Sequence, residues 1–169
     1  MSVFHPTMLR QRIFDIGVDE LKEMGVKALL LDKDNTLTKH HDQQFDNRTA
    51  AWLDEVKQAG IAMMIVSNSR EPRIAPFGKA MGLPFVHTAC KPLPFGFRRA
   101  VKALGVNKKD CLVIGDQTFT DVLGARLYGV RVCQLMPIEV EKKGFRLRRY
   151  FEKGIIRRYQ KKQEKRNKP

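Results

Sequence analysis

Short apolar runs alternate with longer amphipathic stretches along most of the chain. The apolar runs have the length of strands, and the stretches between them have the period and length of helices. The expected strands span residues 27–32, 61–67, 84–88, 111–114 and 131–136. The expected helices span residues 47–59, 71–81, 95–104 and 119–128, and each is followed by a glycine, the usual left-handed cap.

This alternation predicts a parallel sheet covered on both faces by helices. With right-handed crossovers, residues 1–137 form a doubly wound, Rossmann-like α/β domain of three layers and five parallel strands. Residues 1–26 add a short helical segment ahead of the first strand. Each stretch between the motifs is long enough for a single βα unit only, which leaves no room for a large cap domain. We therefore expect an open site beyond the carboxyl ends of the strands.

Charge sets the last fifth of the chain apart. The whole chain of 169 residues carries 32 Lys+Arg and 18 Asp+Glu, a formal net charge of +14. Residues 138–169 hold 13 Lys+Arg and 4 Asp+Glu, or +9, which leaves 19 and 14, or +5, for residues 1–137. Within this tail, apolar residues recur at intervals of four, at Leu147, Phe151, Ile155 and Tyr159. The pattern predicts a basic amphipathic helix, weakened by Gly154, with about eight disordered residues at its end.

The basic helix leaves three kinds of partner open. It can dock on its own domain, lie on an anionic membrane surface, or bind RNA phosphates. No apolar run approaches the roughly 20 residues that cross a bilayer, and the N-terminus has no apolar signal core. The three cysteines are widely spaced and form no CxxC pair. We therefore expect a cytoplasmic protein without a transmembrane segment, with peripheral binding to the inner membrane surface as one alternative.

Oxygen-bearing side chains and one lysine follow the expected strands, where parallel strands bring them to one edge. Asp32 can act as a nucleophile because a carboxylate needs no base at neutral pH. Asp34 can transfer a proton as a general acid and base, and Asp116 adds a hard oxygen ligand of the kind Mg²⁺ prefers. The full set is Asp32, Asp34 and Thr36 after the first strand, Ser67 and Asn68 after the second, Lys91 after the third, and Asp116 and Asp121 after the fourth.

These segments read DKDNTL, SN, KP and GDQTFTD in chain order, and they resemble the four motifs of the haloacid dehalogenase-like (HAD) phosphatase superfamily. The exact sequences of two of these motifs, DKDNTL and GDQTFTDVLGA, resemble more narrowly the YqeG-type group of subfamily IIIA, which is related to mitochondrial phosphatidylglycerophosphate phosphatases. The resemblance covers about residues 27–137. It implies a Mg²⁺-dependent phosphate monoester hydrolase that works through an aspartyl phosphate.

The resemblance also implies a role for each matching residue. Asp32 is the nucleophile and a metal ligand, and Asp34 is the general acid and base that lends its backbone carbonyl to the metal. The remaining roles are loop ordering and phosphate binding for Thr36, phosphate binding for Ser67, Asn68 and Lys91, metal ligation for Asp116, and support for the metal or for Lys91 by Asp121.

An open site favours a large or surface-borne substrate, such as a lipid headgroup, a nucleic-acid end or a phosphoprotein. Phosphatidylglycerophosphate is the substrate that the resemblance and the basic tail suggest together. The alternative is an RNA- or ribosome-associated protein that binds nucleic acid through residues 141–169 and has a secondary or nucleic-acid-directed phosphatase activity. A receiver domain is disfavoured, since its acceptor aspartate would follow the third strand, where this chain has His87 and Thr88.

Five further residues near these motifs have no settled role. Arg70 and Arg73 begin the helix after the second strand, where they either attract an anionic substrate or are simply solvated. His40 and His41 lie in a polar loop after the first strand. Cys90 adjoins Lys91 without an evident histidine partner, so we expect a small buried thiol.

Overall fold

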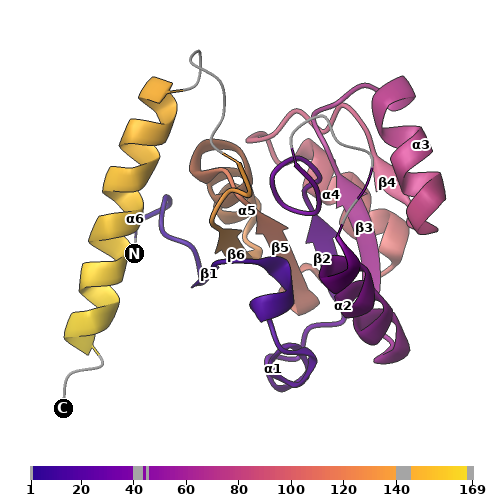
Figure 1. The fold of residues 1–169 in the computed structure, drawn as a ribbon, viewed down its shortest axis with the longest axis horizontal. Coiled ribbons are helices and arrows are strands. Elements are labelled where there is room, and N and C mark those ends of the chain that lie inside the picture. Colours follow the sequence, from indigo (N-terminus) through magenta and orange to yellow (C-terminus); the bar gives the residue numbers. More distant parts are fainter. Residues whose placement is uncertain (1, 40–43, 45, 140–145, 167–169) are drawn as a thin grey trace.

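The computed structural model describes residues 2–39, 44, 46–139 and 146–166, with the backbone alone for 146–149 and 166. Within these residues, six strands form one parallel sheet (Figure 1). The strands are β1 (Met8–Arg10), β2 (Ala28–Leu31), β3 (Ala62–Val66), β4 (Phe85–Val86), β5 (Cys111–Gly115) and β6 (Arg131–Leu135). The α-helices are α1 (Val18–Glu23), α2 (Asn47–Gln58), α3 (Glu71–Met81), α4 (Phe95–Leu104), α5 (Leu123–Tyr128) and α6 (Arg146–Arg166).

The order of strands in the sheet, β1-β6-β5-β2-β3-β4, places the change of winding direction between β2 and β5. Leu31, the last residue of β2, pairs with Ile65 of β3 and with Ile114 of β5. Residues that follow these three strands therefore reach the same edge of the sheet side by side. Ligands of open α/β sheets bind at such a switch point.

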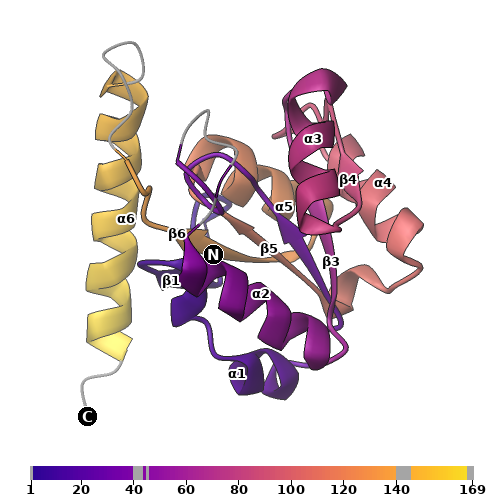
Figure 2. The ribbon, with the colours of Figure 1, turned by 45° about the vertical axis from the view of Figure 1, so that its right-hand side comes forward.

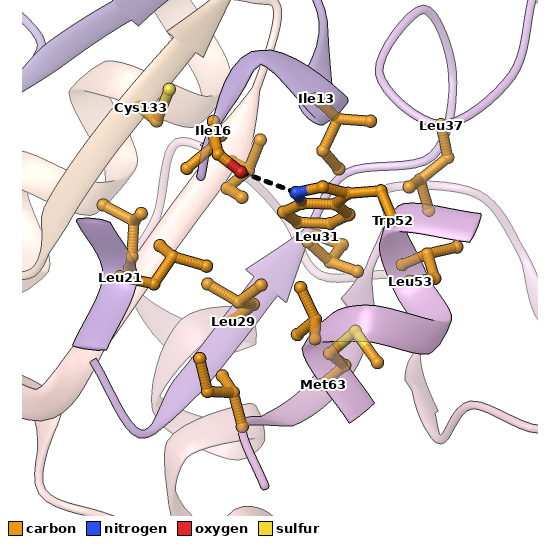
Figure 3. Close-up of a cluster of buried hydrophobic side chains, with 14 of the residues drawn as sticks. Ile13, Ile16, Leu21, Leu29, Leu31, Leu37, Trp52, Leu53, Met63 and Cys133 are labelled. Carbon is orange, nitrogen blue, oxygen red and sulfur yellow. Dashed lines mark hydrogen bonds between the residues drawn. The ribbon is translucent and has the colours of Figure 1, made fainter. Parts of the chain in front are cut away.

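Two hydrophobic layers sandwich the sheet, because successive strand residues point to opposite faces. Leu29 and Leu31 join the layer formed with α1, α2 and α3, whereas Ala28 and Leu30 join the layer formed with α4 and α5. In the first layer the indole Nε1 of Trp52 donates a hydrogen bond to the carbonyl oxygen of Ile16 at 2.7 Å (Figure 3). The doubly wound, three-layer fold expected from the sequence is confirmed.

The structure differs from the expected five-stranded sheet by the short edge strand β1. Its three residues pair with Cys133, Gln134 and Leu135 of β6. Three residues are too few to produce a recognisable alternation, and the sequence therefore signalled only a helix in this region. That helix is present as α1. The expected helix over 119–128 begins instead with a π-helical turn, Thr118–Val122, ahead of α5.

The basic tail forms α6, which stands beside β1 at the end of the sheet opposite β4 (Figures 1 and 2). Ile156 and Tyr159 are buried, and the Tyr159 hydroxyl donates to the carbonyl oxygen of Thr7 at 3.2 Å. The helix therefore docks on its own domain. No helix in the described ranges combines the length and the apolar character needed to cross a membrane.

The docked face of α6 differs from the stripe expected at intervals of four. Phe151 is 55% exposed, whereas Glu152, Ile156 and Tyr159 are buried. Spacings of four and three keep residues on one face of a 3.6-residue helix, whereas repeated steps of four drift around it. The side chain of Leu147 lies outside the described residues. The helix continues to Arg166, so the expected disorder is wrong for residues 162–166, and residues 167–169 are not described.

Candidate active site

The loop after β2 is a compact turn that fixes Asp32. The Asp32 amide donates to the carbonyl oxygen of Ile114 on β5 at 2.9 Å, which continues the sheet by one residue. The Lys33 carbonyl then accepts hydrogen bonds from the amides of Leu37 and Thr38. Asn35 has a φ of 61°, a left-handed conformation that asparagine tolerates better than most residues. The DKDNTL segment thus forms its own tight turn.

A buried ammonium joins two carboxylates at the centre of the site. The Nζ atom of Lys91 lies 2.5 Å from Asp32 Oδ1 and 2.6 Å from Asp121 Oδ1. All three side chains are buried. The second oxygen of Asp121 accepts a hydrogen bond from the Gln117 amide at 3.1 Å. Asp121 therefore contacts Lys91, one of the two roles expected for it from the sequence.

Burial and charge act together on these groups. Burial raises the pKa of Asp32 from 3.8 to about 7; Lys91 opposes this rise, while the charge of Asp121 adds to it. Burial alone would lower the pKa of Lys91, but Asp121 and Asp32 outweigh it and raise that pKa above its ordinary value. One lysine thus stays charged between carboxylates that compete for it.

A divalent cation fits this cluster. Carboxylate oxygens of Asp32, Asp116 and Asp121 all lie within 4.8 Å of one another. All three side chains are buried, and carboxylate oxygens gathered in this way are ligands that suit Mg²⁺. The carboxylate of Asp34 lies outside the group of three. Its expected metal contact was through the backbone carbonyl.

The loop that carries Lys91 is held by Asn68. The Asn68 amide nitrogen donates to the Lys91 carbonyl oxygen at 3.0 Å, and the Lys91 amide donates to the Asn68 side-chain oxygen at 2.7 Å. This pair of bonds fixes a segment in which Thr88 and Cys90 adopt left-handed φ values of 46° and 57°. Strain of this kind persists only where the surroundings enforce it. The side chain of Asn68 thus positions Lys91.

A cavity of about 240 Å³ opens over this cluster. Five of the residues that the sequence singled out for catalysis or phosphate binding line it, namely Asp32, Asp34, Ser67, Asn68 and Lys91. Four more residues complete its wall, namely Ser69, Arg73, Gln117 and Thr120. Thr36 is buried away from this wall, and its hydroxyl has no hydrogen-bond partner within the described part of the chain.

Arg73, at the start of α3, forms a hydrogen-bonded ion pair with Asp34. Its Nη2 atom lies 2.9 Å and 2.8 Å from the two carboxylate oxygens of Asp34. The sequence left two roles for Arg73, attraction of an anionic substrate or simple solvation, and it did not predict the contact with Asp34. Lys33 was missed altogether. It is fully buried, with Nζ 3.6 Å from Asp34 Oδ1 and 4.9 Å from the ring centre of Phe77.

Gly115 leaves the space that Asp121 occupies. A Cβ atom built on Gly115 would lie 2.4 Å from Asp121 Cγ, a distance that real structures do not tolerate. The glycine of GDQTFTD is therefore a packing requirement of the cluster. The thiol of Cys90 is exposed, so the expected burial is wrong, because the left-handed turn carries Cys90 outward. His40 and His41 lie outside the described residues.

Two family profiles match parts of the chain. That of the haloacid dehalogenase-like hydrolases matches residues 42–129, and that of the mitochondrial PGP phosphatases matches residues 2–74. A protein of Bacillus subtilis (strain 168) named "Probable phosphatase YqeG" is 38% identical over 155 residues, which are 90% of each chain.

Solved structures share the fold at low sequence identity. An uncharacterized protein from Listeria monocytogenes serotype 4b aligns with 69% of this chain and 84% of its own, at 18% identity and a TM-score of 0.57. A hydrolase of the haloacid dehalogenase-like family from Brucella suis 1330 aligns with 73% of this chain and 92% of its own, at 13% identity and a TM-score of 0.52. At these identities the likeness concerns the fold alone.

Proposed function

The chain belongs to the haloacid dehalogenase-like hydrolase family and, within it, to the YqeG-type phosphatases of subfamily IIIA, and we propose that it hydrolyses a surface-borne phosphate monoester with Mg²⁺ through a phosphorylated Asp32. The observation that carries the proposal is the buried contact of Lys91 with Asp32 and Asp121. This contact supports the proposal, because it brings a carboxylate that could attack phosphorus and a cation that could bind phosphate together in the wall of one cavity.

Each residue at this floor has a chemical task. Asp32 attacks phosphorus, and a bond from its oxygen to phosphorus forms as the bond to the leaving oxygen breaks. Asp34 gives a proton to that oxygen and then takes one from the water that splits the aspartyl phosphate, which restores Asp32 and releases phosphate. Lys91 and Ser67 bind the phosphoryl oxygens during both steps, and Asn68 orders the loop that carries Lys91.

Asp32, Asp116 and the backbone carbonyl of Asp34 would hold Mg²⁺, with Asp121 beside them. When bound, the ion would offset the negative charge of Asp32 and of the phosphoryl oxygens. The carboxylates supply the oxygen donors, and their burial excludes competing solvent.

A phosphatase screen with Mg²⁺ over lipid, nucleotide, sugar and peptide phosphates tests this chemistry. Asp32→Asn removes the nucleophile, and we expect it to lower phosphate release by at least about 1,000-fold on every substrate. Asp54→Asn is the matched control, since it removes the same charge from an exposed site on α2. Asp32→Asn with native-like turnover would contradict the proposed mechanism.

We propose further that the substrate is a lipid phosphate at a membrane surface, with phosphatidylglycerophosphate as the first candidate. The match of residues 2–74 to the mitochondrial PGP phosphatases supports this substrate. So does the outer face of α6, where Tyr150 and Phe151 are 73% and 55% exposed. With Phe119 and three cations they line a cavity of about 610 Å³; the cations are Lys153, Arg157 and Arg158. Aromatic rings mixed with cations favour an anionic interface.

Turnover on anionic vesicles and on a soluble ester separates surface binding from chemistry. Replacing both Tyr150 and Phe151 by Ser should lower turnover on vesicles several-fold and leave the soluble ester unaffected. Leu127→Ser is the control, because Leu127 is 56% exposed at the far end of α5. Equal losses on both substrates, or binding of RNA that outcompetes the vesicles, would argue against a membrane role.

A further inference from the structure

The contact of α6 with the rest of the protein is centred on a buried carboxylate. Glu152 is 1% exposed, and its Oε1 atom accepts a hydrogen bond from the Thr118 amide at 3.1 Å. Thr118 is itself fully buried. Residues 138–169 have a net charge of +9, and a buried acid in this setting is unexpected for a helix that serves only as a basic surface.

Thr118 lies in the segment that carries Asp116 and Asp121. Its hydroxyl accepts a hydrogen bond from Gln134 Nε2 at 2.8 Å, and the same nitrogen lies 3.4 Å from the Asp116 carbonyl oxygen. Two residues of β6 and α6, Gln134 and Glu152, thus hold Thr118 through its side chain and its backbone. Thr118 is two residues from Asp116 and three from Asp121, so its position constrains the segment that carries both carboxylates.

The amide of Thr118 needs this acceptor. The first amides of a helical turn have no partner within the turn, and Thr118 begins the π-helical turn Thr118–Val122. The neighbouring amide of Gln117 is satisfied by Asp121 Oδ2. A buried amide left without an acceptor costs about 1–3 kcal/mol, which the segment would avoid by moving toward water. Such a movement would separate Asp116 and Asp121 from Asp32.

We propose that Glu152 is a positioning residue of the active site, through which α6 holds Asp116 and Asp121 in place for Mg²⁺. The tail helix is then part of the catalytic unit as well as a surface element. This inference rests on the proposed function in its use of Mg²⁺. Loss of the Glu152 acceptor should weaken Mg²⁺ binding more than it slows turnover at saturating Mg²⁺, because the reacting groups Asp32 and Asp34 lie on another loop.

Calorimetric titration of the full chain with Mg²⁺, without substrate, tests the proposal. Glu152→Ala should raise the Mg²⁺ dissociation constant at least about 5-fold. Glu152→Gln keeps an oxygen acceptor and should stay within about 2-fold of the native value. Glu164→Ala removes an exposed acid from the same helix and should have no effect. Hydrogen exchange should be faster at the Thr118 amide in Glu152→Ala than in the native chain.

Tyr159→Phe separates the role of Glu152 from docking of the helix in general. It removes the hydrogen bond to Thr7 at another point of the docked face. We expect native Mg²⁺ affinity and native exchange at Thr118 in this variant. Equal effects of Tyr159→Phe and Glu152→Ala, or unchanged affinity and exchange in Glu152→Ala, would overturn the proposal. If Glu152→Ala does not fold, a Glu152→Gln protein with strongly weakened Mg²⁺ binding overturns it. A native chain that binds no Mg²⁺ would instead refute the metal dependence in the proposed function.

Discussion

Two glycines show how differently two regions of the molecule are built. One region is the edge of the sheet that carries Asp32, Lys91 and Asp121, called here the catalytic edge, and the other is the tail helix α6. At Gly115, next to the catalytic loop, an added Cβ would lie 2.4 Å from Asp121 Cγ. At Gly154, in the middle of α6, an added Cβ would meet no atom of the described residues within 4 Å. The same residue type is enforced by packing in one region and is free in the other. At the catalytic edge, buried charges hold one another in place, so even one methyl group disturbs them.

Buried charge should make the catalytic edge, unlike the outside of α6, sensitive to pH. Because burial raises the pKa of Asp32 to about 7, we expect the folded protein to keep a proton on Asp32 between pH 3.8 and about 7, where the unfolded chain has lost it. The stabilisation from this proton is complete below about pH 4 and is lost as the pH rises through 7, by up to about 4 kcal/mol.

Chemical unfolding without Mg²⁺ measures this difference. Asp32→Asn should match the native chain near pH 4 and exceed it in stability at pH 8, and Mg²⁺ should stabilise the native chain mainly at pH 8. Glu164→Gln, an exposed change on α6, should follow the native curve throughout. Parallel curves for Asp32→Asn and the native chain would show that Asp32 titrates normally.

The glycine pair gives the next largest effect. Gly115→Ala must displace Asp121 and with it Lys91, and a shift of about 1 Å at a reacting centre can cost about 100-fold in turnover. We expect at least that loss, with a lower melting temperature. Gly154→Ala should leave turnover unchanged and raise stability by about 0.5–1 kcal/mol, since alanine favours helix more than glycine. A Gly115→Ala enzyme with native activity would contradict the crowding described for Asp121.

Arg73 gives the smallest of these effects, because its side chain lies in the cavity wall with 34% of its surface exposed. Arg73→Gln removes both hydrogen bonds to Asp34 and one cation from the cavity wall, and we expect a loss of about 10-fold in kcat/KM. The kcat/KM of Arg73→Lys should lie between the values of the native enzyme and Arg73→Gln, since a lysine cannot bond both carboxylate oxygens in the same fixed geometry. Arg70→Gln is the control, as Arg70 is exposed beside the same helix. Equal losses at both positions would indicate a general attraction of anions.

The sequence predicted the layers of the fold and where its strand ends would meet. Continuous apolar runs and glycine-capped helices carry that information locally, as at Gly82 and Gly105, whose left-handed φ values end α3 and α4. The edge strand β1 was missed because its three residues are too short for a pattern. The docked face of α6 was predicted at the wrong angle around the helix. The prediction followed apolar residues alone, and a glutamate gives no sign in the sequence that it is buried on the docked face.

At the site, the sequence placed Asp32, Lys91 and Asp121 together by motif order, and the geometry agrees with that grouping. The contacts of Arg73 with Asp34 and of Glu152 with Thr118 could not be predicted. Each joins residues more than 30 positions apart through a side chain whose type is also common on surfaces. Only the three-dimensional course of α3 and α6 brings these groups to their partners.

The position of α6 beside β1 also bears on solubility. An edge strand presents unpaired backbone amides and carbonyls, which can pair with a second copy of the chain. The Tyr159 hydroxyl donates a hydrogen bond to the carbonyl oxygen of Thr7, just before this strand. Gln160 and Gln163 line the space between helix and strand. Truncating the chain before α6 would uncover this edge and favour self-association. Point substitutions are therefore the sounder way to study the tail, and shortened chains are expected to aggregate.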